Sequence, residues 1–312
     1  MSTDTELTIV VPDSGMMAAV CGTNDGNLRL MEDYLGVPVF TRGNEISVSS
    51  ADSEIRRKFR FIIDRTIDEI RDGGENGEDI VLSVLNTGRR AAADMSVVVP
   101  GGLRRIYPRS DRQAEYIYLM RTKDVVFCTG SAGSGKTFLA VAEALRLLLT
   151  RAVGKIVMTR PAVEAGENLG FLPGDLEQKT DPYLRPLRDA MEFVLSPETV
   201  RRLFESGAVE TAPLAYMRGR TLDNSVIILD EAQNTTRGQM KMFLTRMGGN
   251  SKVFITGDTT QTDLPRGTVS GLRDSIEILH NIGEIGFMEL TAEDVVRSRI
   301  VRKIIRAYEN EE

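Results

Sequence analysis

Eight consecutive residues combine the side chains and the backbone freedom that bind a phosphate group: Gly130, Ser131, Ala132, Gly133, Ser134, Gly135, Lys136 and Thr137. They satisfy every fixed position of the pattern G-x-x-x-x-G-K-[ST], in which backbone N–H groups of a glycine-rich loop surround phosphate oxygens. The pattern predicts that Lys136 contacts the β- and γ-phosphates of a nucleotide and that Thr137 binds Mg²⁺. An apolar run precedes the loop and an alanine- and leucine-rich stretch follows it. This context favours a phosphate loop between a strand and a helix over an ordinary glycine-rich turn.

Two acidic residues further along the chain have complementary chemistry. Asp230 and Glu231 follow the apolar run 226–229, so a buried strand is expected to deliver both at its carboxyl end. In a nucleotide hydrolase, an aspartate at that place holds Mg²⁺, and the neighbouring glutamate orients and deprotonates the attacking water. An apolar run before two acids is common by chance, but together with the phosphate loop it predicts a nucleotidase.

Two glutamines are weaker candidates for the same site. Gln261 ends the segment Gly257-Asp-Thr-Thr-Gln261, and its amide could contact both the water and the γ-phosphate. A polar loop that caps the preceding strand is the alternative. Gln113 lies upstream of the phosphate loop, where the acceptor and the donor of its amide could recognise the adenine edge.

The expected elements gather these residues in one α/β core. Short apolar runs predict strands at 125–128, 155–159, 225–229, 253–256 and 287–290. Helical stretches separate most of them, and this alternation predicts a mainly parallel sheet covered by helices. We therefore expect a P-loop NTPase domain of the RecA-like kind over residues 109–312.

A smaller α/β domain is expected over residues 1–72. Its elements are a strand at 6–11, a helix beginning at 16, a helix over 27–35, strands at 37–41 and 45–49, and a helix over 54–70. This order, with the loop Gly22-Thr-Asn-Asp-Gly26 between the first two helices, resembles a KH domain, whose GXXG loop contacts a nucleic-acid backbone. The loop has one residue more than that pattern, and Asp25 would lie near phosphate. The resemblance therefore supports the fold more than it supports RNA binding.

Residues 73–108 are expected to link the two domains. They begin with a polar, glycine-rich stretch, continue with a helix over 80–95 and end in a basic segment at 103–109. The basic segment could bind a nucleic-acid backbone, and a solvated connecting strand is an equally consistent interpretation.

The composition limits the class of protein. No apolar run approaches the roughly 20 residues that a membrane helix needs, and the acidic N-terminal segment lacks the basic region of a secretory signal. Two cysteines, Cys21 and Cys128, favour a reducing compartment, and with a single histidine they leave too few ligands for structural zinc. We expect a protein of a reducing compartment without membrane contact. A net charge of −6 gives no global attraction to nucleic acid, so such binding would depend on local basic patches.

The motifs and their order resemble the motor core of superfamily 1 helicases and, more closely, the PhoH family of phosphate-starvation-inducible ATPases. The closer resemblance covers roughly residues 100–309 and is carried by the segments Thr159-Arg160-Pro161, Gly166-Glu-Asn-Leu-Gly-Phe-Leu-Pro-Gly174, Asp181-Pro-Tyr-Leu-Arg-Pro186 and Asp294-Val-Val-Arg297. It implies a cytoplasmic bacterial protein with ATP and Mg²⁺ as ligands, hydrolysis coupled to RNA binding or remodelling, and the endoribonuclease YbeY as an expected partner. The alternative is a nucleotide-dependent switch or scaffold without unwinding activity, and a small-molecule kinase is a weaker third reading.

The sequence contains one motor core, whereas a superfamily 1 helicase closes ATP between two. The arginine that stabilises transition-state charge would then come from a neighbouring subunit or from the C-terminal segment, with Arg297 and Arg299 as candidates. We expect a homo-oligomer in the form of a ring with ATP at each interface, which satisfies this geometry. The segment 166–188 offers Phe171, Tyr183, Arg185 and Arg188 to a single-stranded nucleic acid, unless its aromatic residues simply pack the insertion.

Overall fold

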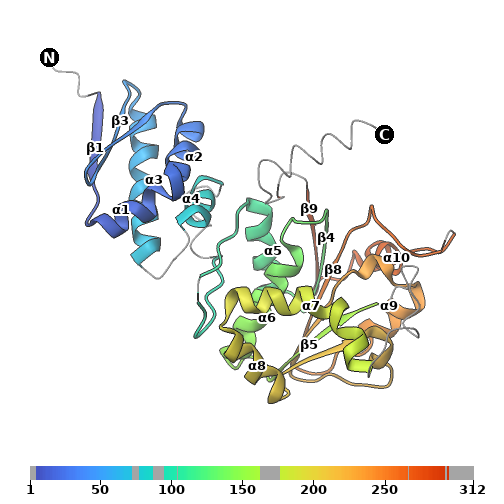
Figure 1. Cartoon of the computed structure of the whole chain (residues 1–312). Coiled ribbons are helices and arrows are strands. Elements are labelled where there is room, and N and C mark those ends of the chain that lie inside the picture. The colour runs from blue at the N-terminus through green and yellow to red at the C-terminus, as the bar shows by residue number, and fades with distance from the viewer. Residues whose placement is uncertain are drawn as a thin grey trace. The chain divides into compact units, whose positions relative to one another are not determined.

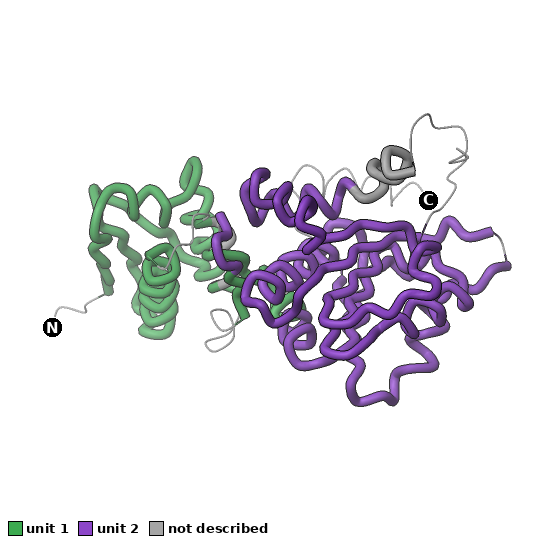
Figure 2. Tube along the Cα trace, turned by 90° about the horizontal axis from the view of Figure 1, so that it is seen from below, with its two compact units in different colours: residues 1–98, 104–114 green, residues 99–103, 115–312 purple. Residues whose placement is uncertain are grey.

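The computed structural model describes residues 5–71, 77–86, 95–103, 105–161, 176–265, 267–291 and 294. The chain forms two compact units, residues 1–98 with 104–114 and residues 99–103 with 115–312 (Figure 2). Each unit has its own sheet and its own hydrophobic core. No helix among the described residues combines the length and the apolar character that crossing a bilayer requires.

The first unit follows the expected order of elements. These are β1 (Glu6–Val10), α1 (Ser14–Cys21), the 3₁₀ turn η1 (Thr23–Asp25), α2 (Gly26–Leu35), β2 (Val39–Arg42), β3 (Glu45–Ser49), α3 (Ser53–Arg71) and α4 (Gly77–Asn86). The strands form an antiparallel sheet in the order β1-β3-β2, and helices lie against one side of it (Figure 1). The apolar stripe of α3, with Phe59, Ile62 and Ile63 fully or almost fully buried, fills the core. The expected small N-terminal α/β domain is confirmed.

The core of the first unit extends beyond residue 72. Ile80, Val81 and Val84 of α4 pack in the same cluster as α3, and so does Tyr107. The Tyr107 hydroxyl donates to Glu69 Oε2 at 3.0 Å. Burial raises the pKa of Tyr107, and the Glu69 carboxylate adds to the effect. The helix expected over 80–95 is α4, and residues 87–94 lie outside the described part of the chain.

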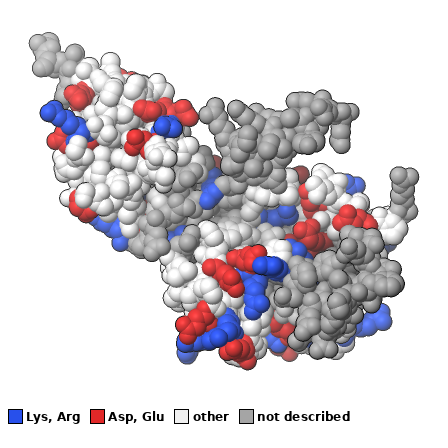
Figure 3. Space-filling view, viewed as in Figure 1, with Lys and Arg blue, Asp and Glu red and all other residues white. Residues whose placement is uncertain are grey.

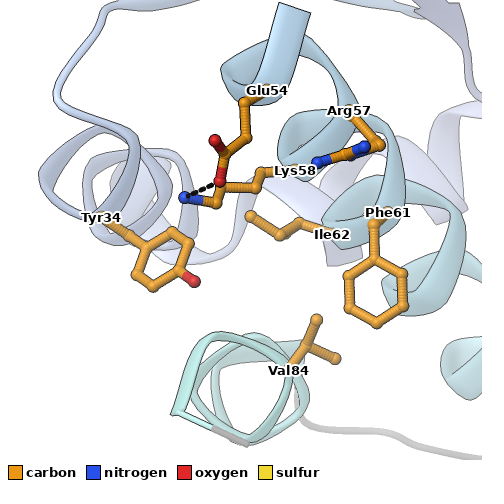
Figure 4. A pocket seen from close by; sticks show the side chains of 7 residues that line it. All are labelled: Tyr34, Glu54, Arg57, Lys58, Phe61, Ile62 and Val84. Atoms are coloured by element: carbon orange, nitrogen blue, oxygen red, sulfur yellow. Dashed lines mark ion pairs between the residues drawn. The ribbon is translucent and has the colours of Figure 1, made fainter. Parts of the chain in front are cut away.

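A pocket of about 260 Å³ opens between α2, α3 and α4 of this unit (Figure 4). Its lining combines apolar and charged side chains: Tyr34, Glu54, Arg57, Lys58, Phe61, Ile62 and Val84. Lys58 Nζ pairs with Glu54 Oε1 at 3.0 Å, so part of the charge of the lining is neutralised within α3.

The second unit contains a six-stranded sheet in which every neighbouring pair is parallel. Its strands are β4 (Val125–Gly130), β5 (Lys155–Arg160), β6 (Val209–Pro213), β7 (Ser225–Leu229), β8 (Lys252–Gly257) and β9 (Ile285–Leu290), in the order β6-β5-β7-β8-β4-β9. The expected P-loop fold is confirmed. The sequence pattern did not predict β6, because this edge strand buries only Val209 and ends at a proline.

Helices cover both faces of this sheet. They are α5 (Asp111–Thr122), α6 (Lys136–Leu149), α7 (Leu176–Val194), α8 (Pro197–Glu205), α9 (Arg237–Leu244) and α10 (Gly271–Leu279), with 3₁₀ turns η3 (Leu214–Met217) and η4 (Ala232–Asn234). The helix α6 packs against β4, β5, β7 and β8. Met240 and Phe243 of α9 and Leu272 of α10 join a core cluster with alternate residues of the same strands, such as Ile227 and Leu229. This arrangement leaves the carboxyl ends of the strands for the site.

Candidate nucleotide site

The predicted phosphate loop connects β4 to α6, as the sequence pattern requires. Gly135 precedes the helix with φ of 88°, a left-handed conformation that favours glycine, and α6 begins at Lys136. Glycine is needed at position 130 for a different structural reason. A side chain there would bring its Cβ within 2.3 Å of the Leu290 carbonyl oxygen in β9, so the sheet itself requires glycine at this position.

The Lys136 side chain lies against the loop that precedes it. Its Nζ donates to the Ser131 carbonyl oxygen at 3.2 Å, and the Ser134 hydroxyl donates to the same oxygen at 2.9 Å. An ammonium group carries three donors, so this contact leaves donors for phosphate oxygens. The loop thus holds Lys136 close to the backbone amides that would surround a phosphate.

Asp230 is the centre of the site. It is 1% exposed at the carboxyl end of β7, between β5 and β8 in the sheet. Its Oδ1 accepts hydrogen bonds from the hydroxyls of Thr137 at 2.8 Å and Thr256 at 2.6 Å. The structure therefore brings together the end of the phosphate loop and the two central strands. A hydroxyl and a carboxylate are hard oxygen donors, which suit Mg²⁺, so the residues present fit the metal that the P-loop fold implies.

Arg160 is a site residue for which the sequence predicted no role. Its Nε donates to Asp230 Oδ2 at 2.9 Å, and a terminal nitrogen pairs with the same oxygen. Buried carboxylates require such a partner, because an unpaired buried charge is costly. Arg160 is the last residue of β5, which pairs with β7, so its contact with Asp230 depends on the order of strands.

Glu231 has an unusual backbone conformation. Its φ of 55° and ψ of 37° lie in the left-handed region, at the entrance to η4. Such residues in non-glycine positions cluster at functional sites, where the surrounding structure enforces them. Its Oε2 accepts a hydrogen bond from Gln233 Nε2 at 2.6 Å. The residue expected to activate water is therefore held at both its backbone and its side chain.

Gln261 lies exposed on the loop that follows β8. In the same loop, Asp258 Oδ1 accepts hydrogen bonds from the backbone N–H and the hydroxyl of Thr260, at 2.9 and 2.6 Å. These contacts fix the beginning of the loop, and the role of Gln261 as a sensor of the γ-phosphate stays a prediction.

Gln113 lies in the first turn of α5, and this part of the helix, up to residue 114, belongs to the first unit. Its side-chain Oε1 accepts a hydrogen bond from the Arg109 N–H at 2.7 Å, and its own N–H donates to the Ser110 hydroxyl at 3.2 Å. A serine followed three residues later by glutamine is a helix-start signal that the sequence analysis overlooked. Recognition of adenine by Gln113 stays a prediction.

The remaining candidates divide into residues outside and inside the described part of the chain. Arg297, Arg299 and Phe171 lie outside it, as does the side chain of Tyr183. Arg188 lies over the ring of Phe204, 5.0 Å from its centroid, so its guanidinium contributes to packing between α7 and α8.

Comparison with known proteins gives a consistent family. A family model described as PhoH-like protein matches residues 105–309. A PhoH-like protein of Bacillus subtilis is 45% identical over 307 residues, covering 96% of this chain and 95% of the relative. One of Mycobacterium bovis is 44% identical over 305 residues, covering 96% of this chain and 86% of the relative. The crystal structure of the Pyrococcus furiosus Hef helicase domain aligns with a TM-score of 0.37 and 17% identity, over 59% of this chain and 39% of that one.

Proposed function

The chain belongs to the family of PhoH-like proteins, and from that premise we propose that it binds ATP with Mg²⁺ and hydrolyses it. The observation that carries the proposal is the hydrogen bond from Thr137 to Asp230, because it joins the two halves of a Mg²⁺-nucleotide site across 93 residues of sequence. The absence of the guanine-specific pattern N-K-x-D from the sequence favours ATP over GTP.

Each residue of the site has a role in this reaction. The loop amides and Lys136 bind the phosphates and offset their charge. Thr137 and Asp230 would hold Mg²⁺, which when bound supplies positive charge to the β- and γ-phosphate oxygens. Glu231 accepts a proton from the attacking water, whose oxygen bonds to the γ-phosphorus while the bond from that phosphorus to the bridging oxygen breaks and ADP leaves. Gln261 would contact the γ-phosphate or the water from the loop after β8.

We further propose that hydrolysis is coupled to RNA. The KH-like arrangement of the first unit and the glycine-bounded loop at 22–26 support this, because such loops contact a nucleic-acid backbone. Lys and Arg side chains alternate with Asp and Glu on the face in Figure 3, and neither sign forms a continuous field over the described atoms visible there. RNA binding would therefore depend on local contacts rather than on overall charge.

The assembly that completes the site is also a proposal. Fast phosphoryl transfer usually requires an arginine finger, and Arg297 or Arg299 from a neighbouring subunit would supply it in a cytoplasmic homo-oligomeric ring. The endoribonuclease YbeY is a further proposed partner, since the family resemblance points to RNA metabolism.

The decisive experiment measures phosphate release from ATP by the purified protein, with and without single-stranded RNA, and identifies the products. We expect ADP and inorganic phosphate, formed faster when RNA is present. Transfer of the phosphate to a small molecule would instead indicate a kinase. Hydrolysis that is unaffected by RNA would favour the nucleotide-dependent switch or scaffold over the RNA-coupled ATPase.

A further inference from the structure

We infer that Gln233 is a positioning residue that holds the carboxylate of Glu231 and connects it directly to the loop carrying Gln261. This inference rests on the proposed function, in which Glu231 activates water. It adds a residue to which the sequence analysis assigned no role, and it specifies how the two parts of the site are mechanically joined.

The orientation of the Gln233 amide follows from its two partners. The Asp258 backbone N–H can only donate, and it reaches Gln233 Oε1 at 2.9 Å. A carboxylate can only accept, and Glu231 Oε2 receives Gln233 Nε2 at 2.6 Å. Rotating the amide by half a turn would set donor against donor and acceptor against acceptor. One side chain therefore fixes both Glu231 and the start of the loop after β8.

The surroundings of Gln233 leave it little freedom to move. It is 4% exposed, and its backbone carbonyl accepts a hydrogen bond from the Ser270 hydroxyl at 2.8 Å. A Cβ at position 257 would lie 2.8 Å from Gln233 Oε1 and 2.7 Å from a methyl carbon of Leu272. A side chain at position 257 would therefore clash with the Gln233 amide. The glycine of the Gly-Asp-x-x-Gln segment thus has a packing role within the site.

Asn234, the next residue, makes a second hydrogen-bonded contact with the same loop. Asn234 Nδ2 donates to Asp263 Oδ2 at 3.1 Å, and Asn234 Oδ1 accepts from the Asp263 N–H at 2.9 Å. The two consecutive amides of η4 therefore hold the loop on either side of Gln261, at Asp258 and at Asp263. Asn234 meets Glu231 through the backbone, where its N–H donates to the Glu231 carbonyl oxygen at 3.0 Å, whereas the Gln233 side chain contacts the Glu231 carboxylate.

This arrangement has a direct consequence for the reaction. Since Gln233 engages Oε2 of Glu231, the other carboxylate oxygen is left to take the proton of the attacking water. Contact between Gln261 and a γ-phosphate would displace the loop. The displacement would reach Glu231 through one buried side chain, that of Gln233. The orientation of the base thus depends on the position of the loop.

The test compares Gln233→Met, which loses both contacts, with Gln233→Glu, which keeps an acceptor for Asp258 but loses the donor to Glu231. We expect kcat for ATP to fall about tenfold or more in both, in the range of effects of a misplaced base, with the Kd for ATP changed less than about threefold. Asn234→Ala should lower kcat less, because Glu231 keeps its partner. The matched control is Gln239→Glu, an exposed amide of α9 whose capping contacts a carboxylate reproduces, and it should behave as wild type.

A double-mutant cycle with Glu231→Gln separates positioning from a general structural role. If Gln233 acts through Glu231, adding Gln233→Met to Glu231→Gln should cause no further loss of the residual rate. An additive loss, or wild-type kcat in both Gln233 variants, would overturn the inference. Failure of the proposed function would look different: the wild-type protein would not hydrolyse ATP, or Glu231→Gln would be fully active.

Discussion

Thr137 and Asp230 are joined by a hydrogen bond of 2.8 Å between the end of the phosphate loop and the end of β7. The same carboxylate oxygen accepts the hydroxyl of Thr256 in β8. Two hydroxyls on one side and the Arg160 guanidinium on the other therefore fix the plane of the Asp230 carboxylate. The protein itself therefore supplies the contacts that orient the carboxylate proposed to hold Mg²⁺.

Replacing Lys136 with alanine should weaken ATP binding by about 10²-fold or more. The phosphates would lose charge-assisted hydrogen bonds, which contribute roughly 1.5–3 kcal/mol each. Titration calorimetry with ATP and Mg²⁺ would measure the loss, with Lys241→Ala as a control, because Lys241 is exposed on α9. Unchanged affinity in Lys136→Ala would mean that the loop does not bind the nucleotide.

Glu231→Gln should bind ATP normally and hydrolyse it about 10²-fold or more slowly, because glutamine cannot accept the proton of the water. Single-turnover measurements with radiolabelled ATP separate the two steps. An undiminished rate in this variant would remove Glu231 from the mechanism and leave the binding site intact.

The stability of the second unit should depend on Glu210 in a pH-dependent way. Arg220 and Lys155 hydrogen bond to Glu210 and, against the opposing effect of partial burial, lower its pKa from 4.5 to about 2. Because the folded-state pKa is the lower one, the stabilisation is complete above pH 4.5 and is lost as the pH falls toward about 2.

Glu210→Gln should therefore unfold at lower urea concentration than wild type near neutral pH, and the difference should narrow as the solution is acidified. Glu205→Gln provides the control, since Glu205 is exposed and its contact with Arg201 spans 3.6 Å. A difference between Glu210→Gln and wild type that widens in acid would contradict the assignment.

Affinity for single-stranded RNA should fall steeply with added salt, since each phosphate contact releases counterions. Deleting residues 1–86 should weaken this affinity while leaving hydrolysis without RNA within about twofold of wild type. Fluorescence anisotropy at several salt concentrations measures the first effect. Equal affinity in the shortened protein would assign the KH-like unit another task, such as docking a partner protein.

Mixing two inactive variants should restore hydrolysis if Arg297 acts between subunits. Arg297→Ala subunits keep the phosphate loop, and Lys136→Ala subunits keep the arginine, so mixed interfaces contain both. The mixture should recover a fraction of the wild-type rate. The rate of Arg297→Ala alone should be very low, because an arginine finger raises kcat about 10³–10⁵-fold where it has been measured. Co-assembly, shown by mass, without recovered activity would favour a finger that acts within its own chain, or Arg299 in its place.

The sequence predicted the parts of the fold that depend on local pattern. The runs that became β4 and β7 are apolar because both faces of a parallel sheet are covered, and the phosphate loop has a fixed spacing. Contacts that depend on strand order could not be anticipated. The pairing of Arg160 with Asp230 requires β5 beside β7, and the bridge from Gln233 requires η4 beside the end of β8. The left-handed turn at Glu231 likewise has no signature in the residue type.

The closure of the first unit by Tyr107 has a consequence for how the protein is made. The helix α3 leaves the ribosome with an apolar stripe that is completed only when α4 and then Tyr107 have been synthesised. At roughly 5–20 residues per second, that interval lasts a few seconds. During it Glu69 of α3 lacks the Tyr107 hydroxyl that donates to it in the folded unit, so the first unit is completed only shortly before the P-loop is translated.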